Sequence, residues 1–235
     1  MYSLEVKLKN QKEMSAPKLI DVTPFEPLII KVHYDGFDWN KLKPICEKML
    51  ADAPAMVDLE QNGASSSVSN RDDQPHTMKE FSDFYKWLTP ITHHILFKEW
   101  GFIDEYEYFI SNSWVNLHPK GGITTEHHHG PCALVCATYL NMPENGGYIQ
   151  FRDPTDIYKS FHSRMNEDNF TWRKVLAKTG DTLIFPAWLR HKTEPNGSDE
   201  DRWVMTTNLM NAFRPPAGKL ESFAKKHNMK WQKQS

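Results

Sequence analysis

Three consecutive histidines, His127, His128 and His129, are the residues of this chain best suited to metal chemistry. On a strand, side chains two positions apart project from one face, about 6–7 Å apart at the backbone. His127 and His129 would then share a face, whereas Glu126 and His128 would point the opposite way. His191, which follows an apolar run, is the best candidate for a third ligand. Three ligands on one side leave about three coordination positions open, as in non-haem Fe(II) sites that activate oxygen.

The same histidines also have a simpler interpretation. Adjacent histidines suit a solvated loop, and a single histidine after an apolar run is more often a hydrogen-bonded core residue than a ligand. Spacing alone therefore leaves a metal site and an ordinary structural role open.

Arg202 adds a second chemical feature. It begins a β-rich run in which alternate residues share one face, namely Arg202, Val204, Thr206 and Asn208. A buried arginine on that face requires an anion, because an unpaired buried charge is costly. A dicarboxylate cosubstrate would supply this anion.

The second half of the chain predicts the sheet that would position these residues. Short β-rich runs alternate with turns, at residues 106–110, 133–140, 148–151, 170–176, 182–185 and 202–209. No helical pattern long enough for a parallel crossover interrupts them. We therefore expect an antiparallel sandwich or jelly roll.

The first half predicts helices that pack on the outside of this sheet. A strand is expected at 27–32, followed by a helix with Asp38 at its N-cap. Thr77 and Glu80 form a capping box that predicts the start of a second helix, which Pro90 should kink or split. Residues 53–76 are polar and aperiodic and predict a long loop, with a lid as one possible role.

Together these patterns predict one α+β, mainly β domain over residues 1–235. Residues 1–105 would form a helical and extended support, 106–212 the β core and 213–235 a C-terminal tail. The tail carries lysines that suit a solvated helix face.

Composition excludes several classes of protein. The 235 residues hold 28 Lys and Arg against 30 Asp and Glu, a net charge of −2, so general nucleic-acid binding is not expected. No apolar run approaches the ~20 residues of a membrane span. Three cysteines are too few for a disulfide scaffold, so a soluble cytoplasmic protein is expected.

Further residues along the chain carry a resemblance to a known family. They are 114–116, Gly121–Gly122, His127–His129, 137–141, 146–151, 180–186, His191 and Arg202. In order and spacing this region resembles the 2-oxoglutarate (2OG) and Fe(II)-dependent oxygenase superfamily, more narrowly a branch distantly similar to prolyl hydroxylases. The resemblance implies a double-stranded β-helix, a cupin-like jelly roll, with the helices outside it.

The resemblance also implies roles for individual residues. His127 and His191 would be iron ligands, and Arg202 would pair with the far carboxylate of 2OG. Tyr139 matches a tyrosine that hydrogen-bonds the same carboxylate; its alternative role is core packing. Trp114, Asn116, Tyr108, Trp188 and Asn208 are candidates for lining the pocket.

The chain departs from the family pattern at two positions. His129 stands where the superfamily usually has Asp or Glu, so the third ligand is either His129 or a reserve carboxylate such as Asp153. Val204 stands where many relatives carry a hydroxyl, a contact that Thr206 would replace.

The sequence therefore predicts an oxidoreductase that uses Fe(II), 2OG and O2, with hydroxylation as the default outcome. The substrate, a small molecule or a peptide, and the oligomeric state are not predicted. Two alternatives stay open: a three-histidine cupin-type dioxygenase that does not use 2OG, and a non-enzymatic jelly-roll binding module.

Overall fold

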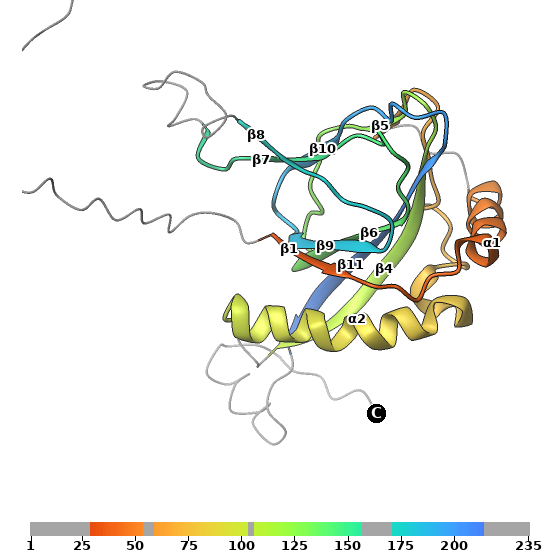
Figure 1. Cartoon of the computed structure of the whole chain (residues 1–235). Helices are drawn as coiled ribbons and strands as arrows, with labels where there is room; N and C mark the ends of the chain where they lie inside the picture. Colours follow the sequence, from red (N-terminus) through yellow and green to blue (C-terminus); the bar gives the residue numbers. More distant parts are fainter. Residues whose placement is uncertain (1–28, 54–58, 103–105, 157–170, 214–235) are drawn as a thin grey trace, which may run out of the picture.

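The computed structural model describes residues 29–53, 59–102, 106–156 and 171–213. Its largest element is a six-stranded antiparallel sheet (Figure 1). In spatial order the strands are β1 (Ile30–His33), β9 (Asp181–Pro186), β6 (Leu134–Asn141), β11 (Arg202–Phe213), β4 (Tyr106–His118) and β3 (Ser65–Ser66). A three-stranded sheet consists of β10 (His191–Thr193), β7 (Ile149–Arg152) and β8 (Trp172–Val175), and a further pair joins β2 (Glu60–Gln61) to β5 (Ile123–Thr124). All these pairings are antiparallel, as the sequence predicts.

The large sheet has two buried faces, because side chains alternate along each strand. In β11, Trp203 and Met205 pack with the helices in an outer core. Val204 belongs instead to an inner core, together with Phe151 of the three-stranded sheet. The inner face of β11 is therefore the one that the small sheet covers.

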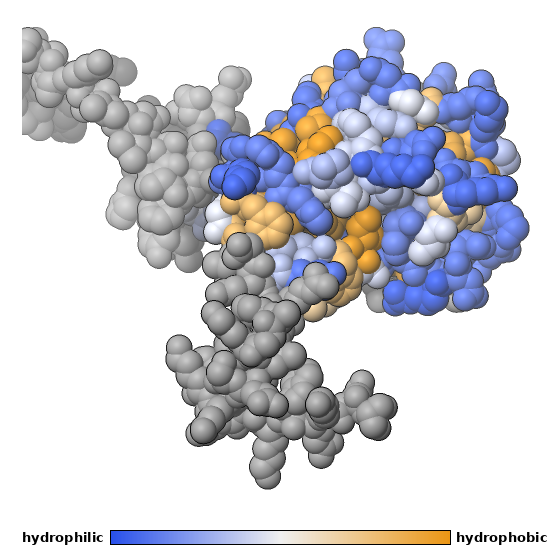
Figure 2. All heavy atoms as spheres, turned by 90° about the horizontal axis from the view of Figure 1, so that it is seen from below, coloured by the Kyte–Doolittle hydropathy of each residue, from blue (hydrophilic) through white to orange (hydrophobic). Residues whose placement is uncertain are grey.

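Two α-helices cover the outer face of the large sheet (Figure 1). Helix α1 spans Trp39–Ala51, and α2 spans Ser82–His94 and continues as a π-helical turn, η3 (Ile95–Glu99). Their apolar faces bury Leu42 and Cys46 from α1 and Phe84 and Leu88 from α2. Their solvent face is mainly hydrophilic, with smaller hydrophobic areas, in the view of Figure 2.

The start predicted for the second helix is wrong. Thr77 ends a short 3-10 helix, η1 (Pro75–Thr77), and its hydroxyl donates to the Gln74 carbonyl at 2.9 Å instead of capping a helix. Met78 is extended, so a second 3-10 turn, η2 (Lys79–Phe81), precedes α2. Pro90 does not split α2: this residue is exposed, so water can satisfy the carbonyl that its ring leaves without a donor.

The long loop predicted at 53–76 is interrupted by short elements in its described part. Residues 60–61 and 65–66 form β2 and β3, and η1 begins at Pro75. Residues 54–58 lie outside the described residues, as do the first part of the strand predicted at 27–32 and the tail after residue 213. None of the helices in the described ranges has the length and apolarity needed to cross a lipid bilayer.

Candidate metal centre

The structure brings the side chains of His127, His129 and His191 together. One ligand nitrogen from each lies within 4.8 Å of the other two. His127 and His191 exchange backbone hydrogen bonds of 3.0 Å in an isolated antiparallel bridge, and the amide of His129 donates to the Ala187 carbonyl at 2.9 Å. The 127–129 segment is thus held by main-chain contacts, although it is not a regular strand.

Main-chain carbonyls orient two of the three rings. The Nδ1 atom of His127 donates to the Thr125 carbonyl at 2.8 Å, and the Nδ1 atom of His191 donates to the Leu189 carbonyl at 2.9 Å. A carbonyl only accepts, so each Nδ1 carries the proton and each Nε2 keeps a lone pair. A hydrogen bond from Nδ1 to a carbonyl is typical of histidines that bind metal through Nε2, because it fixes the tautomer and the orientation of the ring.

The distances within the cluster suit a single cation. The Nε2 atoms of His129 and His191 lie 3.3 Å apart. Two imidazole nitrogens about 2.1 Å from one ion lie roughly 3.0–3.4 Å apart. The donor set therefore fits a divalent transition metal.

The electrostatics of the cluster favour neutral rings. Burial lowers the pKa of His127, lowers that of His129 to about 3, and places that of His191 well below its ordinary value. The neighbouring histidines lower the pKa of His191 further. A neutral imidazole is the form that binds a metal.

The reserve carboxylate Asp153 does not join this cluster, and among the described residues neither does Glu126. The Asp153 carboxylate accepts from the amide and hydroxyl of Thr155, at 2.8 and 2.7 Å. Glu126 points away, as its parity predicts, and pairs with Arg152 and Arg190.

Arg202 is buried, as predicted, and most of its N–H groups have acceptors within the protein. Its Nη1 donates to the carbonyls of Gly146 and Glu194, and its Nη2 donates to the Thr193 hydroxyl at 3.1 Å and the Gly122 carbonyl at 3.5 Å. Only Nε remains buried without a partner. Neutral oxygens thus satisfy four of the five N–H groups but do not neutralise the charge of the guanidinium, so the anion expected from the sequence stays a prediction.

Gly147 permits this packing. Its φ is +81°, and a Cβ at this position would lie 3.2 Å from Arg202 Nη1 and 2.6 Å from the Pro195 carbonyl. Gly146 therefore accepts a hydrogen bond from the guanidinium, and Gly147 allows the turn and leaves room for Arg202.

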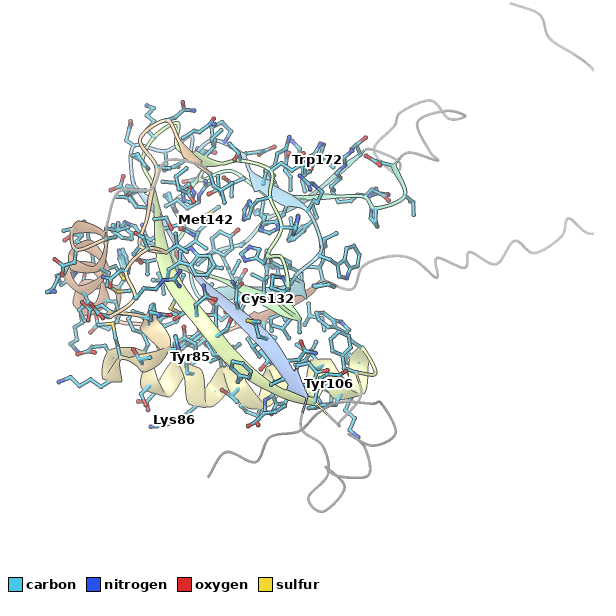
Figure 3. All side chains as sticks on the ribbon, turned by 180° about the vertical axis from the view of Figure 1, so that it is seen from behind. Tyr85, Lys86, Tyr106, Cys132, Met142 and Trp172 are labelled. Carbon is cyan, nitrogen blue, oxygen red and sulfur yellow. The ribbon has the colours of Figure 1, made fainter. Side chains whose placement is uncertain are left out.

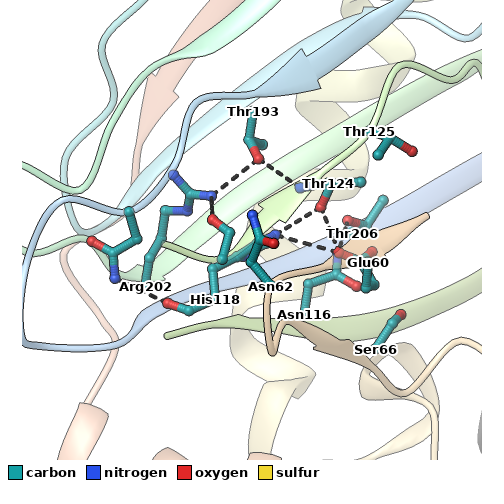
Figure 4. Close-up of polar contacts among 12 residues, drawn as sticks. Glu60, Asn62, Ser66, Asn116, His118, Thr124, Thr125, Thr193, Arg202 and Thr206 are labelled. Carbon is teal, nitrogen blue, oxygen red and sulfur yellow. Dashed lines mark hydrogen bonds and ion pairs between the residues drawn. The ribbon is translucent and has the colours of Figure 1, made fainter. Parts of the chain in front are cut away.

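A network of hydrogen bonds connects Arg202 to Glu60 of β2 through Thr193 and Thr124 (Figure 4). Thr193 Oγ1 accepts from Arg202 and from the Thr124 amide at 2.8 Å. The Thr124 hydroxyl donates to Glu60 at 2.7 Å and lies 2.7 Å from His118 Nε2. His118 is almost fully buried, and burial lowers its pKa.

The three histidines line a cavity of about 750 Å³, within the range typical of small-molecule sites. Tyr139 and Thr206 also line it, and Arg202 lies behind its wall, next to the lining residue Thr193. Burial raises the pKa of Tyr139 to about 12, so its hydroxyl remains a hydrogen-bond donor. The Thr206 hydroxyl accepts from Asn116 at 3.2 Å.

Three of the five residues expected to line the pocket do so, namely Trp114, Asn116 and Asn208. Tyr108 packs instead with Phe97 and Phe102 on the outer side, and the Trp188 side chain is 55% exposed. Sequence reasoning missed Glu60, Arg71 and His118. Glu60 and Arg71 come from the segment interpreted as a loop, which has no periodicity to indicate a cavity wall, whereas the alternation of β4 with Trp114 and Asn116 could have indicated His118.

One protein-family model matches the part of the chain that contains the histidine cluster. Residues 112–208, less than half of the chain, match the model of a family described as "Putative 2OG-Fe(II) oxygenase". This segment contains the three histidines, Tyr139 and Arg202. A search of curated protein sequences gives no match.

Solved structures with a similar fold include several 2OG oxygenases. A prolyl-4-hydroxylase from Pseudomonas putida matches with a TM-score of 0.53 and 14% identity over 77% of this chain and 91% of its own. The 2OG-dependent carbocyclase SnoK of nogalamycin biosynthesis matches with 0.54 and 13% over 84% and 86%. A 2OG-Fe(II) oxygenase family protein from Burkholderia pseudomallei matches with 0.52 and 13% over 80% and 87%.

These findings confirm the fold class and the resemblance expected from the sequence. At such identities the structural likeness shows the fold alone: a mainly β jelly roll with external helices. Among the described strands, the sheets do not close into a barrel.

Proposed function

We propose, from the match of residues 112–208 to the 2OG-Fe(II) oxygenase family, that this chain is an Fe(II)- and 2OG-dependent dioxygenase. It would hydroxylate a substrate not yet identified and release succinate and CO2. The observation that carries the proposal is the convergence of His127, His129 and His191, with two Nδ1 atoms turned to carbonyls. Bound iron would supply the activation of O2, coupled to the oxidative decarboxylation of 2OG.

The chain's own residues would bind and orient the reactants. The three imidazoles would hold the metal through neutral nitrogens. Tyr139 would donate its hydroxyl to the distal carboxylate of 2OG, and the free Nε–H of Arg202 would supply positive charge behind it. For direct contact, Arg202 would exchange one main-chain acceptor for the carboxylate.

Apolar side chains would keep water from the reacting atoms. Val135, Ala137 and Val204 line the cavity beside the histidines. Trp114 stacks on the His129 ring, with centroids 5.8 Å apart and planes 21° apart. A dry cavity of this kind favours reactions whose intermediates water would intercept.

One observation favours a second candidate, a three-histidine dioxygenase that does not use 2OG. Four N–H groups of Arg202 already have acceptors within the protein, and no carboxylate among the described residues joins the histidines. In that case the role of Arg202 would be structural only, through its hydrogen bonds to the backbone at Gly122, Gly146 and Glu194.

An anaerobic titration separates the candidates. Metal-free protein is given Fe(II) and then 2OG, and visible absorption is recorded at each step. The proposal expects a charge-transfer band that develops only after 2OG and weakens in Arg202→Ala and in Tyr139→Phe. Iron binding without any response to 2OG would favour the second candidate, and no iron binding would reject both.

A further inference from the structure

A segment outside the family match, residues 59–74, forms one wall of the cavity. Its lining residues are Leu59, Glu60, Ser66, Val68 and Arg71. We infer that Arg71 is the residue that binds the carboxylate of the substrate, and that the substrate is a small organic acid with an apolar body. This inference rests on the proposed function, because the histidine cluster lines the same cavity.

The wall is fixed to the core sheet. Ser65 and Ser66 pair with β4 as an added edge strand. The Ser67 amide donates to the Val115 carbonyl at 2.9 Å, and the Ser67 hydroxyl accepts from the Val115 amide at 3.0 Å. Ser67 is buried against the sheet, so its neighbours Ser66 and Val68 face the cavity.

Asn70 holds the turn that presents Arg71. Its side-chain oxygen accepts from the amides of Asp72 and Asp73, at 3.2 and 3.0 Å, and its Nδ2 donates to the Met49 carbonyl of α1 at 3.3 Å. The Arg71 carbonyl accepts from Gln74 Nε2 at 3.2 Å. Arg71 therefore extends from a backbone that is ordered on both sides before any ligand binds, which lowers the entropic cost of binding.

The charges on the cavity lining leave Arg71 as the group available to an anion. Glu60 is engaged by Thr124 at 2.7 Å and lies 3.5 Å from His118 Nε2. Within the part of the chain that the structure describes, no carboxylate pairs with Arg71, and Asp73 instead lies 3.7 Å from Lys48. Arg71 is exposed at the cavity and contributes the one side chain among the described lining residues that is charged regardless of pH.

The remaining lining defines the rest of the occupant. Leu59, Val68, Trp114 and Met210 give the cavity an apolar surface. A guanidinium binds a carboxylate through two parallel hydrogen bonds, and one positive charge balances one carboxylate. The cavity of about 750 Å³ suits a small molecule held at one end by Arg71 with its apolar part against this surface.

The test uses the full-length protein loaded with redox-inert Ni(II) and saturated with 2OG, so that the cosubstrate position is filled. A library of aliphatic and aromatic carboxylic acids, each paired with its primary amide, is screened by ligand-observed saturation-transfer NMR. The variants are Arg71→Gln and Arg71→Lys. Lys86→Ala, which removes an exposed charge on α2, is the matched control. The dissociation constant of 2OG is measured on every sample.

We expect acids to bind wild-type protein at least about tenfold more tightly than their amides. Arg71→Gln should abolish this preference, Arg71→Lys should keep part of it, and Lys86→Ala should leave it unchanged. The inference is overturned if acids show no advantage over amides, if no acid binds, or if Arg71→Gln retains the full preference. Failure of the proposed function is a separate readout, since wild-type protein would then not bind 2OG.

Discussion

The Nε2 atoms of His129 and His191 lie 3.3 Å apart, although 62 positions separate the two residues in the chain. The His191 ring is fixed by its Nδ1 bond to Leu189, so its Nε2 lone pair faces His129. Their planes are nearly parallel, at 9°. The fold therefore places the two Nε2 atoms at a separation that suits one shared cation, or a hydrogen bond between the two rings.

This relationship predicts that His129 is a metal ligand. His129→Ala should weaken Fe(II) binding by about 10- to 100-fold, as expected when part of a metal site is lost. His129→Asp should bind Fe(II) at least as tightly as wild-type protein, because it adds a negative charge beside the cation. Anaerobic isothermal titration calorimetry measures both affinities.

His128→Ala is the matched control for these variants. His128 adjoins His129, and its Nδ1 accepts from the Gly130 amide at 3.0 Å. It lies outside the convergent group, so its loss should leave the Fe(II) affinity unchanged. Equal affinities for His128→Ala and His129→Ala would contradict the assignment of His129.

Tyr139 gives a prediction about 2OG. Tyr139→Phe should raise the dissociation constant of 2OG about three- to tenfold, the usual effect of one lost hydrogen bond. Fe(II) affinity should not change. Fluorescence or calorimetric titration of the metal-loaded protein measures this effect, with the exposed Tyr148→Phe as control. Unchanged 2OG binding in Tyr139→Phe would show that the hydroxyl has only a packing role.

The histidine cluster was predictable because its main determinant is local. Alternation along a locally extended chain predicts His127 and His129 on one side, although contacts with Ala187 and His191 hold this segment in place. The register that pairs His127 with His191 comes from two hydrogen bonds between distant segments, which no local pattern encodes. The apolar run before His191 made it the best candidate for a third ligand, and the resemblance to a family supported that choice.

The surroundings of Arg202 were less predictable, because its acceptors are carbonyls. Every residue has a main-chain carbonyl, so residue type does not indicate that the carbonyls of Gly146 and Glu194 accept hydrogen bonds from Arg202. The same applies to residues 59–74, where serines and Asn70 form strand and turn contacts with distant backbone. Short-range polarity predicts a loop there, but nonlocal hydrogen bonds decide the structure.

The interface between α2 and the large sheet contains a buried hydroxyl pair. The hydroxyls of Tyr85 and Thr207 lie 2.9 Å apart, and Figure 3 shows Tyr85 between the helix and the sheet. Tyr85→Phe should lower the free energy of unfolding by about 1–2 kcal/mol, because Thr207 loses a buried partner. The double variant with Thr207→Val should cost less than the sum of the two single changes. Urea denaturation measures each value, and strict additivity would contradict a direct interaction.

His33 predicts how stability depends on pH. Its Nδ1 lies 2.8 Å from the buried carboxylate of Asp181, and its Nε2 lies 2.8 Å from Asp35. The Asp181 contact, followed by the Asp35 contact, raises the pKa of His33 above its ordinary value of 6.5. The protonated ring is thus favoured in the folded state. Its stabilisation is fully present below pH 6.5 and is lost as the pH rises through the higher pKa of the folded protein.

The contribution of His33 to the melting temperature should therefore fall from mildly acidic to mildly alkaline pH. The buried histidines with lowered pKa values contribute with the opposite sign. His33→Gln should therefore make the melting temperature rise more steeply with pH than it does in wild-type protein. His93→Gln, an exposed change on α2, is the control and should melt with the wild-type slope. Differential scanning calorimetry across this pH range provides the measurement. A His33→Gln protein that keeps the full wild-type pH dependence would assign the slope to other groups.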